Sequence, residues 1–436
     1  MAKIGVAKII INPDIGSLMS GFAPLRAYTE KHSDLYLRAV LIEDSQRTLF
    51  LGFDTIAIDA YLYREIVERV TNYNISEEHV IVSATHTHSG PVGLVNTKEG
   101  IFKGVTGLFG DYDSDFVQVM LAKVEEVLKE AINDLEEIAS FKYGNTELAG
   151  IATERHDPQL PGDNRLVAWS YQTISGRNIL FYNFACHPTV LNGSSPYLSS
   201  DFPGVVADEL SAEYVVVNFI NGSCGDISTR FTRKADPLVD VVNFGKKISQ
   251  AVGALIAKAE PQAVDDIKVQ QQTYYLKARQ FESVEDAQAT LEVANEKAKV
   301  AAKLPQGERR AIESFAEGAR TNLAFAQNFK GIDEIAIPVT FLLINNQAFV
   351  SIPAELFSSL SNSLRADLGI NILGYTNGYS LYIADENAYK AGYYEALSSI
   401  YQVGQGEVLL KEITKDVVVW LKEVRKEQNY EKTRSA

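Results

Sequence analysis

The hydrophobic positions in the first hundred residues follow two different periods. Runs rich in β-branched and aromatic residues over 35–42, 48–57 and 79–84 predict strands. A stripe of apolar residues at helical spacing over 61–73 predicts a helix between the second and third of these runs. Strands and helices that alternate along a chain in this way are typical of an α/β fold.

Longer patterns follow in the middle of the chain. A cap at Asp113 or Ser114 begins a long amphipathic helix that should lie against a sheet. A second helix should begin at Asp236-Pro237, where a capping residue precedes proline at the first helical position. Further strands are predicted at 177–184, 213–219, 335–345 and 348–352.

A segment rich in Ala, Glu and Lys, from about 280 to 330, predicts a pair of helices. A Ser283/Asp286 capping box opens it, and Leu304-Pro305-Gln306-Gly307 separates its two halves. We interpret this pair as a helical hairpin inserted into one catalytic domain over 1–425, followed by a charged and frayed tail over 426–436. The predicted fold class is α/β, with a mixed sheet flanked by helices.

Composition narrows the possible partners and ligands. A net charge of -15 disfavours nucleic acid, and no stretch is apolar enough to span a membrane. No cleavable apolar segment stands at the start, so we expect a cytoplasmic protein. With only two cysteines and six histidines, any metal should be held by His and carboxylate ligands. Nothing in the sequence indicates an oligomeric state.

Reactive residues directly follow four of the predicted strands, and strand ends in open α/β sheets are where ligand sites form. His86, His187 and Glu355 together would supply a zinc site with imidazole and carboxylate ligands. Taken singly, each has an ordinary explanation. The pair His86 and His88 can bond to backbone, His187 can be a loop histidine, and Glu355 can be a first-turn carboxylate of a helix.

Several motifs occur together in one order and resemble the neutral, non-lysosomal ceramidase family. They are His86-Thr87-His88-Ser89-Gly90-Pro91, Asn183 to Pro188, Gly225-Asp226-Ile227-Ser228, Pro353-Ala354-Glu355, and Asn377-Gly378-Tyr379-Ser380-Leu381-Tyr382 with Tyr389 and Tyr394-Glu395. The resemblance spans roughly residues 1 to 420, which corresponds to the catalytic domain of that family.

The resemblance implies a single zinc ion held by His86, His187, Glu355 and Tyr382, with His88 and Tyr394 on the substrate side. It also implies hydrolysis of the amide of ceramide, a sphingolipid, to a fatty acid and a sphingoid base. Zinc lowers the pKa of a coordinated water, which can then attack an amide carbonyl.

The remaining candidate residues receive more open interpretations. His88 is the first choice for the general acid, and His88 or the Tyr394 hydroxyl could stabilise the oxyanion. Ser228 could be a nucleophile, a hydrogen-bond partner of the substrate or a turn residue. Asp226 could orient His88 or His187, or cap a turn. Arg155 could contact a substrate hydroxyl or carboxylate, or be an exposed loop cation.

The chain departs from the family pattern beside the predicted pocket. Ser228 is followed by Thr229-Arg230 where the family usually has Pro-Asn, and Val92 breaks a glycine pair. A zinc hydrolase of another N-acyl compound, such as an acyl amino acid, amino sugar or peptide, is therefore a second hypothesis. A closed pocket with a cation would favour a charged amide, and an apolar channel would favour ceramide. A binuclear amidohydrolase barrel and a non-catalytic zinc-binding protein are the third and fourth hypotheses.

Overall fold

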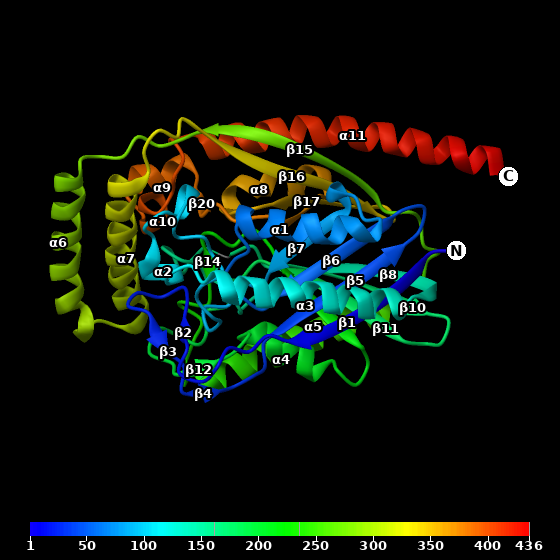
Figure 1. The fold of residues 1–436 in the computed structure, drawn as a ribbon, viewed down its shortest axis with the longest axis horizontal. Coiled ribbons are helices and arrows are strands. Elements are labelled where there is room, and N and C mark those ends of the chain that lie inside the picture. Colours follow the sequence, from blue (N-terminus) through cyan, green and yellow to red (C-terminus); the bar gives the residue numbers. More distant parts are fainter. Residues whose placement is uncertain (161, 235, 436) are drawn as a thin grey trace.

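Two β-sheets form the centre of the molecule, a computed structural model that describes residues 1–160, 162–234 and 236–435 (Figure 1). The larger sheet has eight strands in the order β13-β11-β10-β8-β1-β5-β6-β7. Their bounds are β13 Val216–Asn221, β11 Asn178–Phe184, β10 Arg165–Thr173, β8 Glu136–Glu147, β1 Lys3–Ile10, β5 Tyr36–Glu43, β6 Arg47–Phe53 and β7 Val80–Ala84. The pairs β6/β7 and β11/β13 are parallel and the other pairs are antiparallel, so the sheet is mixed.

The smaller sheet has four strands in the order β15-β16-β17-β19. These are β15 (Lys268–Lys277), β16 (Glu334–Ile344), β17 (Gln347–Ile352) and β19 (Asn371–Gly374). Only the pair β17/β19 is parallel. Short two-stranded ladders complete the set: β2 (Leu18–Met19) with β3 (Arg26–Ala27), β4 (Glu30–Lys31) with β12 (Tyr197–Leu198), β9 (Thr153–Glu154) with β14 (Ile227–Ser228), and β18 (Glu355–Leu356) with β20 (Tyr382–Ile383).

The two sheets pack against each other, and helices cover their outer faces. Side chains from one face of each sheet, among them Trp169, Phe181, Leu342 and Phe349, form the core between the sheets. Because successive side chains on a strand point to opposite faces, the alternate positions face the helices. The covering helices are α1 (Ala60–Val70), α3 (Ser114–Asn133), α4 (Phe202–Glu209) and α5 (Pro237–Lys258) on the larger sheet, and α8 (Ser358–Leu368) and α11 (Gln405–Ser435) on the smaller.

The helices begin where their capping residues predict. The Asp113 carboxylate accepts the N–H groups of Asp115 and Phe116 at the start of α3, and Asp236 accepts the N–H of Leu238 ahead of α5. These contacts satisfy N–H groups that have no partner within the helix. None of the helices in the described part of the chain is long and apolar enough to cross a membrane.

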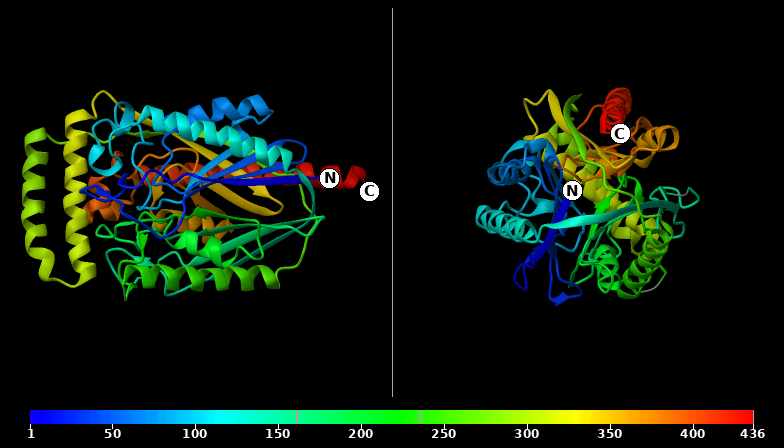
Figure 2. Two further views of the ribbon diagram at one scale, coloured as in Figure 1. Left: turned by 60° about the horizontal axis from the view of Figure 1, so that its bottom comes forward. Right: turned by 90° about the vertical axis from the view of Figure 1, so that its right-hand side faces the viewer.

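The predicted hairpin is present as α6 (Val284–Val300) and α7 (Gln306–Asn328), which stand side by side at one end of the molecule (Figure 2). Ser283 caps α6 by accepting the Asp286 N–H, as the capping box predicts. The two helices share a small core of Leu291, Ala294, Ala316 and Ala319. The inner helix α7 also packs on α10 (Tyr394–Leu397). The predicted fold class is confirmed, whereas the single-domain boundary at residue 425 stays a prediction.

Three features differ from the sequence interpretation. The second sheet was not expected, because its edge strand β15 is rich in Lys and Gln and only partly buried, so it lacks a clear apolar pattern. Glu355 lies in β18, not in a helix, and α8 begins three residues later at Ser358. Residues 426–435 continue α11 as a helix.

The larger sheet curls, and this brings distant strand ends together. Strand β13 at one edge contacts β6 and β7 near the other edge. The chain after β19 joins them. Asn377 donates its backbone N–H to Val82 O (2.7 Å) and accepts the Val82 N–H on its side-chain oxygen (2.7 Å). The segments that follow β7, β11, β17 and β19 therefore converge at the end of the molecule where the α6/α7 hairpin stands (Figure 1).

Candidate metal centre

The predicted metal ligands meet at this convergence of strand ends. His86 and His88 follow β7, and His187 follows β11. Glu355 in β18 is the register partner of Tyr382 in β20, so these two side chains project from neighbouring positions. All five residues are buried. Residues separated by up to about 300 positions in the sequence therefore form one cluster.

The distances within the cluster suit a shared ion. His187 Nε2 lies 2.8 Å and His86 Nε2 lies 3.5 Å from Oε2 of Glu355. The Nε2 atoms of His86 and His88 are 3.3 Å apart, and ligand atoms of His86, His88 and His187 all lie within 4.8 Å of one another. Two ligands bound tetrahedrally to one zinc ion at about 2.0 to 2.1 Å stand roughly 3.3 Å apart. The residues present therefore fit zinc.

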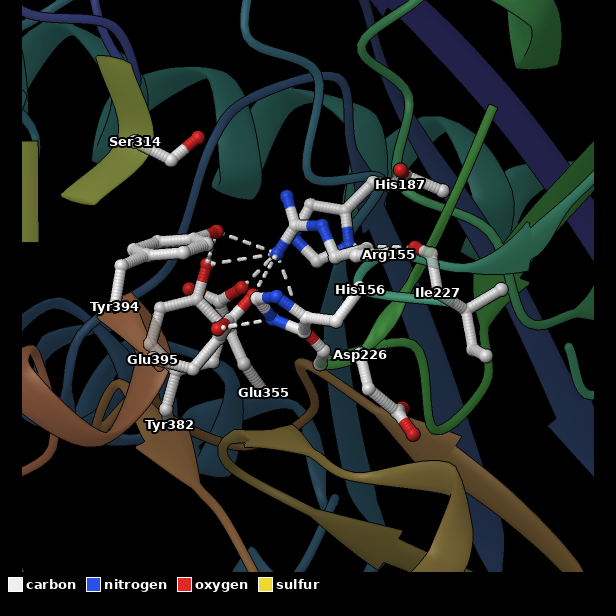
Figure 3. Close-up of polar contacts among 12 residues, drawn as sticks. Arg155, His156, His187, Asp226, Ile227, Ser314, Glu355, Tyr382, Tyr394 and Glu395 are labelled. Carbon is white, nitrogen blue, oxygen red and sulfur yellow. Dashed lines mark hydrogen bonds and ion pairs between the residues drawn. The ribbon is translucent and has the colours of Figure 1, made fainter. Parts of the chain in front are cut away.

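Backbone carbonyl groups fix the orientation of two of the imidazoles. His86 Nδ1 lies 2.7 Å from Ile56 O. His187 Nδ1 lies 3.1 Å from Ile227 O, a contact drawn in Figure 3. Because a carbonyl oxygen can only accept, Nδ1 of each ring must carry the proton. The lone pair of each Nε2 then faces the cluster, which is the arrangement that metal-binding histidines usually have.

His86 itself has a left-handed backbone, with φ of 67°. This conformation is uncommon for a residue with a side chain and persists where the surroundings enforce it. Here the His86 N–H donates to Thr55 O (3.0 Å), next to the carbonyl that accepts from the ring. The turn after β7 therefore holds both the main chain and the imidazole of His86.

The protonation states of the buried groups suit metal binding. Burial lowers the pKa of His187 to about 4, and the positive charge of Arg155 adds to this effect. Burial and the neighbouring His86 lower the pKa of His88 well below its ordinary value. Burial alone would raise the pKa of Glu355, but His86 and His187 outweigh it and hold that pKa well below its usual range. Neutral imidazoles and an ionised carboxylate are the forms that bind a metal.

Two tyrosines that the sequence interpretation gave no role contact the carboxylate. The Tyr379 hydroxyl donates to Oε1 of Glu355, and the Tyr375 hydroxyl lies 3.5 Å from Oε2. The tyrosine-rich block was a signal for them, since Tyr379 belongs to the Asn377 to Tyr382 motif. Their role depends on a backbone with several left-handed residues, including Tyr375, Asn377 and Leu381, which the sequence does not reveal.

Tyr382 and Tyr394 lie together beside the cluster. Their hydroxyl groups are 2.8 Å apart, and Nη1 of Arg155 donates to both. Burial and the negative charge of Glu355 raise the pKa of Tyr382 well above its ordinary value, so its phenol is neutral when no metal ion is bound beside it. The structure thus brings Tyr382 to the cluster, and its role as a ligand stays a prediction.

Arg155 is a buried residue at the site, not an exposed loop cation. Its guanidinium donates to Gly225 O (3.0 Å) and forms an ion pair of 3.3 Å with Glu395 (Figure 3). The other oxygen of Glu395 lies 2.8 Å from Nε2 of His156. Arg155 therefore positions the two tyrosine hydroxyls, and Glu395 compensates its charge.

Of Ser228 and Asp226, only Ser228 faces the cavity over the cluster. Ser228 lines the cavity and is paired through its backbone with His187. Its hydroxyl oxygen accepts the Arg230 backbone N–H (3.2 Å) and contacts no base among the described residues, which favours a substrate hydrogen bond over a nucleophile.

Asp226 accepts both the N–H and the hydroxyl of Ser358 (2.7 and 2.8 Å), so its carboxylate caps the start of α8. Among the described residues, it forms no hydrogen bond with His88 or His187.

A cavity of about 70 Å³ lies over the cluster. Its floor is formed by His86, His88, Glu355 and Tyr382, and Phe22, Leu108 and Phe109 contribute apolar walls. The remaining lining includes Arg155, Arg230, Arg233 and Arg310, the last of these from α7 of the hairpin. The arrangement thus combines a possible metal site, hydroxyl donors and a group of cations.

Comparisons with known proteins agree with the motifs. Residues 3–158 match the family model described as neutral/alkaline non-lysosomal ceramidase, N-terminal. The crystal structure of neutral ceramidase from Pseudomonas aeruginosa has the same fold, with a TM-score of 0.75 and 15% sequence identity over 97% of this chain and 75% of that chain. A ceramidase complexed with C2 matches over the same shares at 16% identity, also with a TM-score of 0.75. The resemblance to the neutral/alkaline ceramidase family is confirmed.

Proposed function

We propose that this chain, which shares the fold of the neutral ceramidases, is a zinc-dependent hydrolase of an N-acyl amide bond. The observation that supports it most is the convergence of His86, His187 and Glu355, with both Nδ1 atoms held by backbone carbonyls. His86, His187, Glu355 and Tyr382 would hold one ion. When bound, zinc would act as a Lewis acid and lower the pKa of a coordinated water towards about 7.

The residues around the cluster provide the proton transfers. His88 Nε2 faces His86, while His88 Nδ1 is buried and has no hydrogen-bond partner among the described residues. Because burial keeps the His88 imidazole neutral, it can accept a proton from the attacking water. The same ring can then donate that proton to the leaving nitrogen, which cannot depart from the tetrahedral intermediate unprotonated.

Tyr394 is the hydroxyl donor best placed to stabilise the oxyanion. Arg155 donates to the Tyr394 oxygen, which polarises the phenol, and the Tyr394 proton is free for the substrate when the Tyr382 hydroxyl is the donor in the contact between the two. Preformed donors of this kind stabilise the negative charge that develops on the carbonyl oxygen. Ser228, which lines the same cavity, supplies a second hydroxyl for the substrate.

Ceramide is the first substrate to test, because both similar solved structures are named ceramidases. The second candidate is another N-acyl compound. It is favoured by Arg230 and Arg233, which line the cavity and whose guanidinium groups donate to neutral oxygens, so that a neutral lipid amide would leave both without an anionic partner.

The test measures product release from ceramides and N-acyl amino acids by the zinc-loaded protein. The His86→Ala variant should lose most of its bound zinc and at least a hundredfold of its activity, because one ligand and its Nε2 lone pair are removed. His32→Ala is the matched control, since His32 bonds to Ser199 outside the cavity. Activity that survives His86→Ala, or zinc content that does not change, would contradict the proposal.

A further inference from the structure

The cavity over the metal centre is far more basic than the rest of this acidic chain. The chain has a net charge of -15, yet Arg155, Arg230, Arg233 and Arg310 line one small cavity. Two of them are already neutralised by a carboxylate: Arg155 by Glu395, and Arg310 by Glu317 through two hydrogen bonds of 2.9 and 2.6 Å. In the described part of the chain, Arg230 and Arg233 form no such ion pair with a carboxylate.

Arg230 is a buried cation with neutral partners. Its side chain donates to Arg155 O (2.9 Å) and to the Ser314 hydroxyl (3.1 Å), and the residue is only 4% exposed. Within the described part of the chain, no carboxylate lies within 4.0 Å of its guanidinium.

Arg233 and Arg26 are two further arginines near Arg230 that donate to neutral oxygens. Arg233 donates to Thr189 O (2.9 Å) and Thr229 O (3.3 Å), both of which are neutral carbonyls, while the charges of Asp201 and Asp240 partly offset the effect of burial on its pKa. Arg26 bonds to Ser195 O and His88 O, and its Nη1 is buried with no hydrogen-bond partner among the described residues. Arg26 and Arg233 both line a second hollow of about 470 Å³, which shares Phe22, Arg310 and Glu317 with the cavity and so continues it outward.

A buried cation that forms no ion pair with a carboxylate is unfavourable unless another anion binds to it. Transferring a charge out of water costs several kcal/mol, and neutral hydrogen-bond acceptors recover only part of this. Burial lowers the pKa of Arg230 to about 10, which still leaves it charged at neutral pH. Guanidinium groups bind carboxylates and other oxyanions with geometric specificity. The site is therefore built to receive a negative charge from outside the chain.

The cations are also connected to the reaction centre. The backbone N–H of Arg230, not its guanidinium, donates to the Ser228 hydroxyl, and the backbone of Ser228 is paired with that of the metal-site residue His187, so Arg230 stands close to the centre in the chain. Arg230 further holds the carbonyl of Arg155, whose side chain contacts Tyr382 and Tyr394. An anion at Arg230 and Arg233 would thus occupy the same cavity as the amide that is cleaved.

We infer that the substrate is an N-acyl amide bearing an anionic group, a carboxylate or a sulfonate, which Arg230 and Arg233 bind while the amide lies at the metal centre. This inference rests on the proposed amide hydrolysis and specifies its substrate class. An N-acyl amino acid supplies the carboxylate, and an N-acyl aminosulfonate supplies the sulfonate. Arg230 is the main specificity-determining residue.

The experiment compares three amides with the same acyl chain: an N-acylglycine, an N-acyltaurine and the neutral N-acylethanolamine. The zinc-loaded enzyme should cleave at least one of the two anionic amides with a kcat/KM at least tenfold higher than that of the neutral one. Comparing glycine with taurine identifies the preferred anion. Arg230→Gln should lower kcat/KM for the preferred anionic amide by about ten- to a hundredfold, because a charged hydrogen bond is lost. The loss for the neutral amide should be at least about fivefold smaller, a contrast that loss of folding would not produce.

Two further variants separate charge from structure. Arg230→Lys keeps the charge and should recover part of the preference, although not the paired geometry of a guanidinium. Arg47→Gln removes the same charge where Arg47 pairs with Glu43 (2.8 Å), at the opposite end of β6 from the site, and should change none of the rates. If the wild type prefers the neutral amide, or if Arg230→Gln weakens all three amides equally, the inference is wrong.

A binding measurement distinguishes failure of this inference from failure of the proposed hydrolysis. An alkyl sulfonate has no amide to cleave and is a weak zinc ligand, so its calorimetric binding to the zinc-loaded protein reports the cations alone. Binding that exceeds that of the matching alcohol tenfold, and that Arg230→Gln abolishes, supports the anion site even if no amide is hydrolysed. Equal binding of the sulfonate and the alcohol overturns it, even if ceramide is hydrolysed.

Discussion

The Tyr379 hydroxyl donates a hydrogen bond to Oε1 of Glu355, and this leaves Oε2 facing His187 and His86. The two oxygens of one carboxylate therefore have different partners. Because Tyr379 stacks on Phe102 with the rings 8° from parallel, its hydroxyl cannot follow the carboxylate freely. The tyrosine thus orients the predicted metal ligand without being one itself.

Tyr379→Phe should weaken zinc binding by about ten- to a hundredfold, the usual effect of removing a group that orients a metal ligand. The ring and its stacking on Phe102 remain, so the thermal stability of the zinc-free protein should change little. Zinc affinity can be measured by competition with a chelator. Tyr275→Phe is the control, since Tyr275 is 64% exposed on β15. Unchanged zinc affinity would contradict the orienting role.

Glu395→Gln should destabilise the fold strongly, because it leaves the buried guanidinium of Arg155 without its carboxylate. Breaking a buried ion pair from one side costs about 3 to 5 kcal/mol. Denaturant unfolding of the zinc-free protein measures this change in the free energy of unfolding. Glu386→Gln removes an exposed partner of Lys390 and should change stability by less than about 0.5 kcal/mol. Equal effects of the two variants would show that Glu395 does not stabilise Arg155.

Asp226 should make stability depend on pH. Burial raises the pKa of its carboxyl to about 7, above the value near 4 expected in the unfolded chain. The folded state then holds a proton that the unfolded state releases, so stability present below about pH 4 is lost as pH rises towards 7. About three pKa units correspond to roughly 4 kcal/mol, as an order of magnitude.

The variant Asp226→Asn keeps an acceptor for the Ser358 N–H and cannot ionise. Its free energy of unfolding, relative to that of the wild type, should therefore rise between pH 4 and pH 7. Asp236→Asn, which changes an exposed cap of α5, is the control and should follow the wild type across this range. The idea fails if the wild type and Asp226→Asn show parallel pH profiles in denaturant unfolding.

Gly318 and Gly253 offer a matched pair of helix substitutions. A Cβ at Gly318 in α7 would lie 3.0 Å from Tyr394 O and 3.1 Å from Tyr394 Cβ, whereas at Gly253 in α5 the nearest atom would be 3.9 Å away. Both substitutions by alanine gain helix propensity of about 0.5 to 1 kcal/mol. Only Gly253→Ala should be stabilising. Gly318→Ala should displace Tyr394, lower kcat several-fold and destabilise the fold by about 1 to 3 kcal/mol. Thermal melts and initial rates measure both effects.

Short-range patterns were sufficient to select the residues of the cluster that we propose as the metal centre. His86, His187 and Glu355 each follow a strand, and strands that end at one edge of the fold bring such residues together. The caps at Asp113, Asp236 and Ser283 could also be predicted, because a cap depends only on residues next to it in the sequence.

Contacts between distant segments could not be predicted in the same way. The contact of Tyr379 with Glu355 requires a left-handed backbone at Asn377 and Leu381, and no periodicity encodes such a conformation. Arg26 lies near the start of the chain and Arg230 near its middle, and only the folded chain shows that neither forms an ion pair with a carboxylate within 4.0 Å among the residues described.

The hydrogen bonds from His86 to Ile56 O and from His187 to Ile227 O involve main-chain acceptors that every amino acid carries. Substitution of either isoleucine side chain therefore leaves the acceptor in place. The tautomers of the two histidines are thus insulated from sequence drift at positions 56 and 227, and relatives of this chain can vary there while keeping the same nitrogen available to a metal. Replacing the Ile56 or Ile227 carbonyl would require a change to the backbone itself.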